Sequence, residues 1–373
     1  MRGGDFFIPR FPTSPPSNQH YLHPSGMTAN TEPSYALLKA GVTLSPRSKN
    51  YFLGLPTKGL LLKDPLHVQI VRSLTGRHTP QEIADGLMCD VELVAEFLRT
   101  LELSGLIDAD SSPLQISRST ERDLSQELIR ERLNSELALL THRAGSTAGG
   151  RSEFQSRSER RILISGENRL ARNLLVLLQA SGFTHTRLIQ RAQLPLRIGA
   201  SDVCGLVVKP ADIGKLRNSF TDELIRGAQI TKPESASIGG GIKPDLIIST
   251  IPVEWDYFQR WMSEGSVHLH INPVVGREIE IGPLVTPGAD PCLRCVRLAK
   301  RDHGTDVSQE NLRSEAPTAA IAYIAGLIAL AIGEYFATGE SSLRASSHWY
   351  DLLNPMQLPE IRHWNFHPEC GCQ

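Results

Sequence analysis

The sequence predicts an α/β protein in two parts, a small winged-helix-like module followed by a larger doubly wound sheet. Three short strand-like runs and three helical segments between residues 34 and 116 predict the first part. From Arg161 onward, short apolar strands alternate with helices, which is the pattern of parallel β-α-β units. Two cysteine pairs in the second part predict a metal site that joins distant segments of the chain.

The chain divides into four segments. Residues 1–33 are rich in Pro and Ser, so we expect a disordered arm there. Residues 34–116 and 161–373 are the two predicted domains. Between them, residues 117–160 hold a polar-faced helix over 119–142 and then a linker rich in Gly, Ser and charged residues.

In the first domain, each predicted helix begins after a residue whose side chain can accept a hydrogen bond from the first free backbone amides. These capping residues are Asp64, Thr79 and Asp90. Glu82 stands three residues after Thr79 and completes a capping box. The strands predicted before these helices span residues 35–44, 50–55 and 59–64.

The second domain is predicted as a series of strands with helices between them. The predicted strands span residues 161–165, 185–190, 204–208, 244–250 and 266–271. Helices are predicted over residues 168–182 and 253–265, and an extended pair near the sheet edge over 277–288. The apolar run 319–333 is shorter than the about 18 residues of a membrane span, so it predicts a buried helix and no membrane partner.

The strongest chemical signal is a C-x-x-C pair, Cys292 and Cys295, together with a C-x-C pair, Cys370 and Cys372. Four thiolates in two pairs predict one closed tetrahedral zinc site, and Gly371 supplies the tight backbone of the second pair. A saturated metal is structural rather than hydrolytic. Three alternatives remain open: separate redox dithiols, disulfides, or cysteines with no common role.

A glycine turn after the strand 161–165 is the second signal. A dinucleotide or ATP site would carry G-x-G-x-x-G, so that backbone amides can approach phosphates. Gly166 is the first glycine, but Asn168 and Ala171 occupy the other two glycine positions. Gln190 also stands where an acidic residue would hold the ribose. The pattern therefore favours a nucleotide-type fold in which only Gly166 remains as a degenerate nucleotide-binding position.

Composition excludes several function classes. The net charge is -1 and the pI is about 6.9, so no basic field is available for nucleic acid. The acidic third helix of the first domain, over 90–105, also argues against DNA binding. No apolar run near Met1 has the form of a signal peptide, so we expect a cytoplasmic protein.

These motifs in this order resemble the ThiF-like superfamily, the ubiquitin-activating type of adenylyltransferase, many of which carry a zinc between two cysteine pairs. Within it, the chain is most similar to the leader-peptide-binding proteins of thiazole/oxazole-modified microcin (TOMM) biosynthesis, the bacteriocin cyclodehydratase-domain proteins. Residues 37–87 are similar to the RiPP recognition element of those proteins. The resemblance covers about residues 35–373 and implies a Rossmann-type second domain with a zinc clip.

The resemblance also implies a function. The family's active members have three glycines, an acidic ribose ligand and a carboxylate for magnesium, whereas Ser249, Thr250 and Pro252 stand in the last of these places. We therefore expect no bound ATP, no independent activity and no catalytic residue. The expected role is a scaffold that holds a precursor's leader peptide and presents it to a YcaO-type enzyme. The alternative is an active adenylyltransferase acting on a protein or peptide C-terminus.

The expected peptide site lies in the first domain. A leader peptide would add as a strand to the sheet at residues 50–55 or its neighbours, with the third helix forming a groove beside it. The candidate groove residues are Val94, Phe97, Leu98 and Leu101. The same side chains are also needed to pack the three helices. The sequence leaves open whether the protein forms a homodimer.

Overall fold

The structure is a computed structural model of the 373-residue chain. It describes residues 37–55, 58–107, 126–144, 150–166, 168–189, 197–203, 207–217, 219–220, 243–272, 274, 276–304 and 316–372. The chain forms two compact units. The first comprises residues 1–114 and 124–154, and the second comprises residues 115–123 and 155–373.

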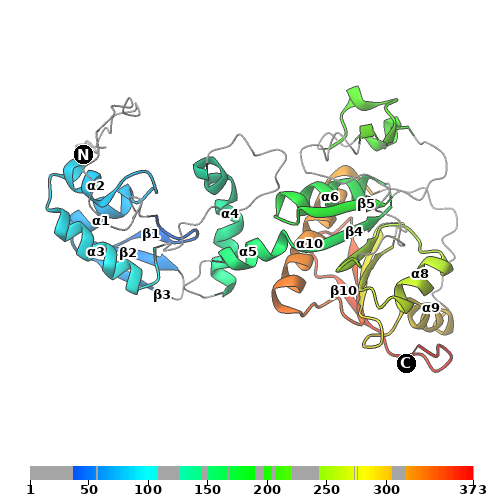
Figure 1. Cartoon of the computed structure of the whole chain (residues 1–373). Coiled ribbons are helices and arrows are strands. Elements are labelled where there is room, and N and C mark those ends of the chain that lie inside the picture. Colours follow the sequence, from blue (N-terminus) through cyan, green and yellow to red (C-terminus); the bar gives the residue numbers. More distant parts are fainter. Residues whose placement is uncertain are drawn as a thin grey trace, which may run out of the picture. The chain divides into compact units, whose positions relative to one another are not determined.

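The first unit contains a three-stranded antiparallel sheet and the three predicted helices (Figure 1). The strands β1 (Thr43–Arg47), β2 (Asn50–Leu55) and β3 (Lys58–Leu62) lie in the order β1-β2-β3. The helices are α1 (Pro65–Ser73), α2 (Pro80–Leu87) and α3 (Val91–Leu103). The predicted strand 35–44 was wrong in its bounds. Its residues 37 and 38 make only isolated bridges, and β1 begins at Thr43 and continues beyond the predicted end, through Arg47.

The three predicted caps are confirmed. The Asp64 carboxylate accepts from the Leu66 amide at 2.8 Å, and the Asp90 carboxylate accepts from the Glu92 amide at 3.0 Å. Thr79 and Glu82 form the reciprocal capping box. These bonds satisfy amides that have no partner inside a helix, which explains why the helices begin where they do.

Two further helices follow the first three. The helix α4 (Gln126–Ala144) lies in the first unit and overlaps the predicted helix 119–142. The range predicted as a linker contains the helix α5 (Arg151–Arg157), so the prediction of a structureless linker was wrong there. Phe154 is 2% exposed, and its burial gives this short helix an apolar anchor that a linker would lack.

The second unit is built on a seven-stranded sheet with the order β10-β9-β8-β7-β6-β4-β5. The strands β4 (Arg161–Ser165), β5 (His185–Ile189), β6 (Leu246–Ser249) and β7 (His268–Ile271) pair in parallel. The strands β8 (Glu278–Val285), β9 (Ser346–Asp351) and β10 (Glu360–His363) extend this half with antiparallel pairing. The predicted parallel sheet is therefore confirmed for β4 to β7, and these strands form one half of a larger mixed sheet.

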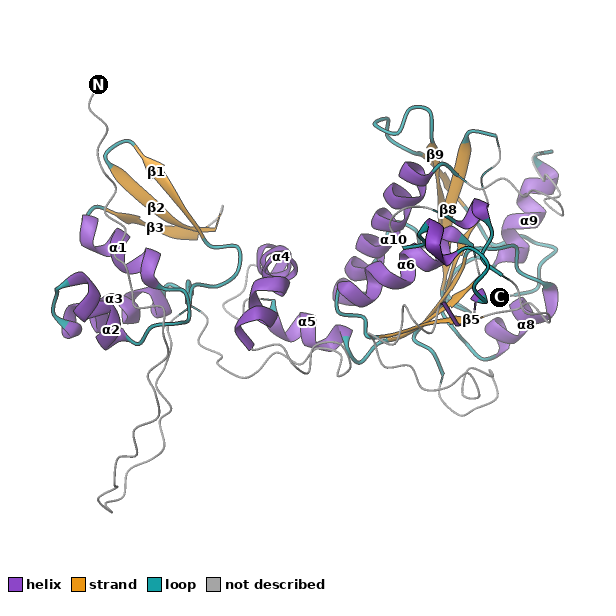
Figure 2. Cartoon of the chain, turned by 90° about the horizontal axis from the view of Figure 1, so that it is seen from above, coloured by secondary structure: helices purple, strands orange, loops and turns teal. Residues whose placement is uncertain are grey.

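Helices cover both faces of this sheet (Figure 2). The helices α6 (Arg169–Ala180) and α10 (Thr318–Thr338) pack together on one face. The helices α8 (Trp255–Ser263) and α9 (Leu293–Asp302) lie on the other. By length and composition α10 could cross a membrane, but Ile324 and Ile328 are fully buried in the protein core. Core helices pass the same test, and this burial agrees with the predicted buried helix.

Three predictions for the second unit need correction. Residues 278–285 form one strand in the interior of the sheet, between β7 and β9, not an extended pair at its edge; the edges are β5 and β10. The strands β9 and β10 were not predicted, because their residues are largely polar. In the predicted strand 204–208, Val207 and Val208 lie in a bend, and the other residues lie outside the described part of the chain.

Candidate functional site

The two predicted cysteine pairs meet in the second unit. Cys292 is the N-cap of α9, Cys295 lies in its first turn, and Cys370 and Cys372 follow β10. The sulfur atoms of Cys292 and Cys370 are 3.3 Å apart, and those of Cys295 and Cys372 are 3.4 Å apart. All four sulfurs lie within 4.8 Å of one another. Tetrahedral coordination with metal–sulfur bonds of about 2.3 Å places sulfurs about 3.8 Å apart, so the four can hold one metal ion.

The surroundings of this cluster fix its geometry. The His367 amide donates to the Cys295 sulfur at 3.3 Å, and the Arg294 guanidinium donates to the Cys370 carbonyl at 3.2 Å. The His367 ring bonds the Asp302 carboxylate at 2.8 Å and accepts from the Glu369 amide at 3.2 Å, so both of its nitrogens are engaged outside the four sulfurs. Burial raises the pKa of Cys292 to about 11, so a metal would have to displace the proton of that thiol.

Protein groups occupy the space beside the turn between β4 and α6, where a nucleotide phosphate would bind in an active relative. Gly166 has a φ of +140°, and a Cβ there would lie 2.1 Å from the Thr250 hydroxyl oxygen, so only glycine fits. Asn168 caps α6, accepting from the Ala171 amide at 2.9 Å, while its Nδ2 donates to the Thr250 carbonyl at 2.8 Å. An amide at the helix N-terminus that could bind a phosphate is thus already bonded to Asn168.

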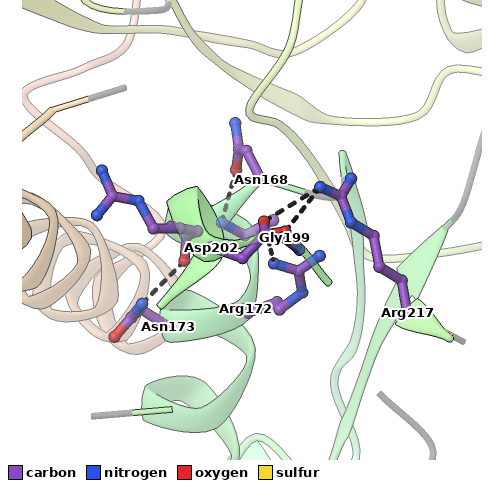
Figure 3. Close-up of polar contacts among 8 residues, drawn as sticks. Asn168, Arg172, Asn173, Gly199, Asp202 and Arg217 are labelled. Atoms are coloured by element: carbon purple, nitrogen blue, oxygen red, sulfur yellow. Dashed lines mark hydrogen bonds and ion pairs between the residues drawn. The ribbon is translucent and has the colours of Figure 1, made fainter. Parts of the chain in front are cut away.

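A buried charge cluster lies beside this turn (Figure 3). Arg172 of α6 is 1% exposed, and its guanidinium is 3.2 Å from the Asp202 carboxylate. Arg217 donates to both oxygens of the same carboxylate, at 3.1 and 2.9 Å. The Gly199 amide also donates to it at 2.8 Å. Two guanidinium groups therefore share one carboxylate.

The charges of this cluster are only partly balanced. Burial opposes ionisation of Asp202, but the Gly199 amide, Arg217 and Arg172 together hold its pKa below the usual range. Two positive groups against one negative group leave a net positive charge. Among the described residues, Nε and Nη2 of Arg172 are buried and make no hydrogen bond. The cluster can therefore attract an anion.

Ser249 and Thr250 stand where active members of the resembled family would carry a carboxylate for magnesium. The Ser249 hydroxyl donates to the Ile251 carbonyl at 2.7 Å, and the Thr250 hydroxyl donates to the Ser165 carbonyl at 3.3 Å. Both side chains are buried and bonded to backbone. The Thr250 bond links this segment to β4, the Ser249 bond stays within the segment, and neither side chain is an acidic ligand for a metal.

The predicted groove residues lie in the core of the first unit. Val94 and Leu101 have no exposed surface, and Phe97 is nearly buried. The Phe97 ring stacks on His67 of α1 with centroids 4.1 Å apart. Leu98 is half-buried and packs at the margin of this core. Of the four, Leu98 offers most surface to a ligand, and the binding role of all four stays a prediction.

Sequence reasoning missed the Arg172–Asp202–Arg217 cluster. One local signal was available: Arg172 stands among Leu170, Ala171 and Leu174 on a helix whose face packs against the sheet. An arginine among such neighbours indicates a buried ion pair. Its partner, Asp202, could not be found because it lies 30 residues away in a short 3-10 turn, Ala200–Asp202.

No family model matches this sequence, and comparison with curated proteins gives no match. Solved structures of E. coli MccB share its fold. The structure of MccB with ATP has a TM-score of 0.53 at 12% identity, covering 90% of this chain and 99% of that one. MccB with AMPCPP and MccA gives 0.52 at 11%, and MccB with N-formylated MccA gives 0.52 at 12%, both with the same coverage.

Identities this low show the fold alone, and the shared mixed α/β fold agrees with the Rossmann-type second domain that was predicted, whereas the winged-helix character of the first domain stays a prediction. Because one of the MccB structures contains ATP, the comparison gives no support to the expectation that this chain binds none. The role of Gly166 in binding a nucleotide stays a prediction.

Replacing Asp202 by Asn should destabilise the second unit by about 3–5 kcal/mol, because it leaves two guanidinium groups without their carboxylate. The matched control is Asp212→Asn. Asp212 ends a similar 3-10 turn and accepts from the Lys209 amide, but its partner Lys215 is 42% exposed, so the loss should be far smaller. Urea unfolding at pH 7 measures both, and equal losses would contradict the assignment.

The ionised Asp202 also predicts that the stability of the second unit depends on pH. The lowered pKa of Asp202 stabilises the folded state above the unfolded value of about 4, and this contribution is lost as pH falls through the lowered folded value. The difference in stability between wild type and D202N should therefore shrink in acid. A difference that stays constant down to pH 2 would argue against an ionised Asp202 in the folded protein.

Proposed function

We propose that this protein is a non-catalytic scaffold that binds the leader of a ribosomally made precursor peptide and presents the precursor to a YcaO-type cyclodehydratase. The observation that carries the proposal is the open edge of β3 in the first unit. β3 pairs with β2 on one side and with no described strand on the other. An open strand edge offers backbone groups to which an extended peptide can add as a fourth strand.

Backbone direction identifies the groups on this edge. The Thr43 hydroxyl of β1 donates to the Gly54 carbonyl at 3.2 Å, so the polar groups of Gly54 point away from β3. Gly54 stands opposite Gly59, which makes this a non-hydrogen-bonded pair of β2 and β3. By alternation along β3, Gly59 and Leu61 direct their amides and carbonyls outward. These are the groups that a peptide would pair with.

The side chains beside the edge suit an apolar peptide. The Leu61 side chain is 51% exposed. An exposed leucine on an edge strand favours pairing with a strand of another chain, and most proteins avoid such residues there. The helix α1 packs against β3, and the stack of His67 on Phe97 joins it to α3. Leu93 and Leu98 of α3 are exposed and half-buried, respectively. A groove beside α1 and α3 would give side-chain specificity, and backbone pairing would give affinity.

The second unit supports a role without catalysis. Asn168 occupies an amide that a phosphate would use, Asp202 balances one of the two arginines beside it, and Ser249 and Thr250 offer no carboxylate for magnesium. Chemistry on the peptide would then come from a partner enzyme. We propose that the protein is located in the cytoplasm.

We assign zinc to the cysteine cluster, with Cys292, Cys295, Cys370 and Cys372 as ligands. Four thiolates favour zinc over the hard cations, and they leave no open coordination position for water or substrate. The metal would therefore be structural. It would tie the segment after β10 to α9, closing a loop of the chain that contains α10.

A second candidate is an active adenylyltransferase. The shared fold with an MccB structure containing ATP favours it, as do the positive charges of the buried Arg172 and the half-buried Arg217 beside the turn after β4. This candidate predicts ATP-dependent pyrophosphate exchange in the presence of a peptide, and a rise in the thermal midpoint with ATP and magnesium. The scaffold proposal predicts neither, and pyrophosphate exchange would refute it.

Peptide binding is tested with fluorescein-labelled synthetic peptides that cover short reading frames encoded beside this gene. Leu61→Pro removes an outward amide that the β2–β3 ladder does not use, so it should fold and bind at least about fivefold more weakly. Leu61→Thr keeps the amide and should retain more affinity than L61P. Fluorescence anisotropy measures both. If no peptide binds, or if L61P binds as well as wild type, β3 is not the peptide site.

Metal content tests the zinc assignment. Purified protein should contain about one zinc per chain by elemental analysis. The double variant Cys370→Ser, Cys372→Ser should lose the zinc and unfold at lower temperature, whereas Cys89→Ser, in the first unit, should lose neither. A zinc-free protein with an unchanged thermal midpoint would overturn the assignment.

A further inference from the structure

Charge is separated within the first unit, although the chain as a whole has a net charge of -1. Residues 43–73, which form the three strands and α1, contain five Lys and Arg residues and one acidic residue. Residues 80–103, which form α2 and α3, contain six acidic residues and one Arg. The part of the unit that holds the peptide site is therefore positive. Its five cations are all exposed: Arg47, Lys49, Lys58, Lys63 and Arg72.

Two of these cations stand at the ends of β3, the strand with the open edge. Lys58 is the first residue of β3, and Lys63 directly follows the last one. Asp64, the acidic residue next to Lys63, accepts from the Leu66 amide as the cap of α1. No described acidic side chain forms an ion pair with either lysine. Both ammonium groups can therefore meet a ligand that lies along β3.

An aromatic ring reaches the same edge from β2. Phe52 stands opposite Leu61, and its ring lies over Gly59, where a Cβ would collide with it. Because Gly59 has no side chain, the Phe52 ring and the exposed Leu61 side chain form an apolar surface beside the outward backbone groups. The Arg47 guanidinium of β1 lies 6.0 Å from the centre of that ring. Side chains of an added strand that face this surface would therefore be apolar.

The order of these groups along β3 describes one kind of peptide. Side chains alternate between the two faces of a strand, so Lys63 follows Leu61 on the face that carries Phe52. Lys58 lies on the other face, with the buried Leu62. Acidic residues on an added strand would be favourable opposite the two lysines, and basic residues would be unfavourable. The matching peptide carries two acidic residues five positions apart, as Lys58 and Lys63 are, with apolar residues between them.

We propose that β3 selects an acidic segment of the leader peptide, with Lys58 and Lys63 as the residues that determine this specificity. The inference rests on the proposed function, because it names the chemistry of the peptide that the same edge binds. Exposed cations also attract nucleic acid. The open strand backbone and the apolar surface of Phe52 and Leu61 suit an extended peptide instead.

Two fluorescein-labelled synthetic peptides test the selection on the full chain. The first carries two Glu residues five positions apart with Val and Thr between them, and the second carries Lys in place of both Glu residues. Wild type should bind the Glu peptide about tenfold more tightly than the Lys peptide at about 50 mM salt, and this preference should narrow at about 500 mM salt. Fluorescence anisotropy measures both affinities.

Charge reversal on β3 should reverse the preference. The double variant Lys58→Glu, Lys63→Glu repels the Glu peptide and attracts the Lys peptide, so it should bind the Lys peptide more tightly. The matched control is Lys49→Glu, because Lys49 is also exposed but stands in the turn between β1 and β2. K49E should keep the preference of wild type. Circular dichroism melts confirm that each variant is folded.

The outcomes separate this inference from the proposed function. If both peptides bind wild type equally and L61P weakens both, β3 is the peptide site but the charge selection is refuted. A preference for the Glu peptide that survives in K58E/K63E would also refute it, as would displacement of the Glu peptide by a DNA duplex of about 20 base pairs. If neither peptide binds, the selection is refuted, and the peptides from the neighbouring reading frames decide the proposed function by themselves.

Discussion

The second unit is organised around the side chain of Asn168, which links the N-terminus of α6 to the carboxyl end of β6. Its oxygen caps the helix, and its nitrogen holds the Thr250 carbonyl. The approach of the two segments is close enough that Gly166 admits no side chain. Because α6 is fixed in this way, Arg172 is buried one turn along it and must be balanced by Asp202. The turn and the charge cluster are thus consequences of one arrangement.

This arrangement bears directly on function. In a fold that commonly holds nucleotides at the carboxyl ends of parallel strands, a helix N-terminus is the place where a phosphate binds. Here protein groups fill part of that place, while Arg172 retains buried donors that have no partner among the described residues. The site is therefore neither a preserved nucleotide pocket nor a neutral surface. The proposed work of the protein consequently falls on the first unit, whose β3 edge is open.

Much of this could be predicted from local sequence. Asp64, Thr79 and Asp90 were identified as caps because a cap depends on residues within one turn of it. The cysteine pairs also met as predicted, since spacing alone marks metal ligands. The strands β9 and β10 could not be predicted, because their largely polar residues lack the apolar alternation by which strands are recognised in a sequence. Asp202 was missed for another reason: its pairing with Arg172 depends on how segments far apart in the chain come together.

The core residues of the first unit show the limit of pattern reading. Val94, Phe97, Leu98 and Leu101 recur at helical spacing, which is equally typical of a core face and of a binding groove. Burial decides between the two for Val94 and Leu101, which have no exposed surface. The surface that remains for a ligand is the edge of β3, which depends on strand order and not on helical spacing.

Hydrogen–deuterium exchange with and without a bound leader peptide tests the central claim most directly. If the peptide adds to β3, exchange of the Gly59 and Leu61 amides should slow markedly on binding, because these outward amides gain partners. Amides of the turn between β4 and α6 should keep their rates. Unchanged exchange along β3, with new protection at Gly166 and Asn168, would place the ligand in the second unit and contradict the account.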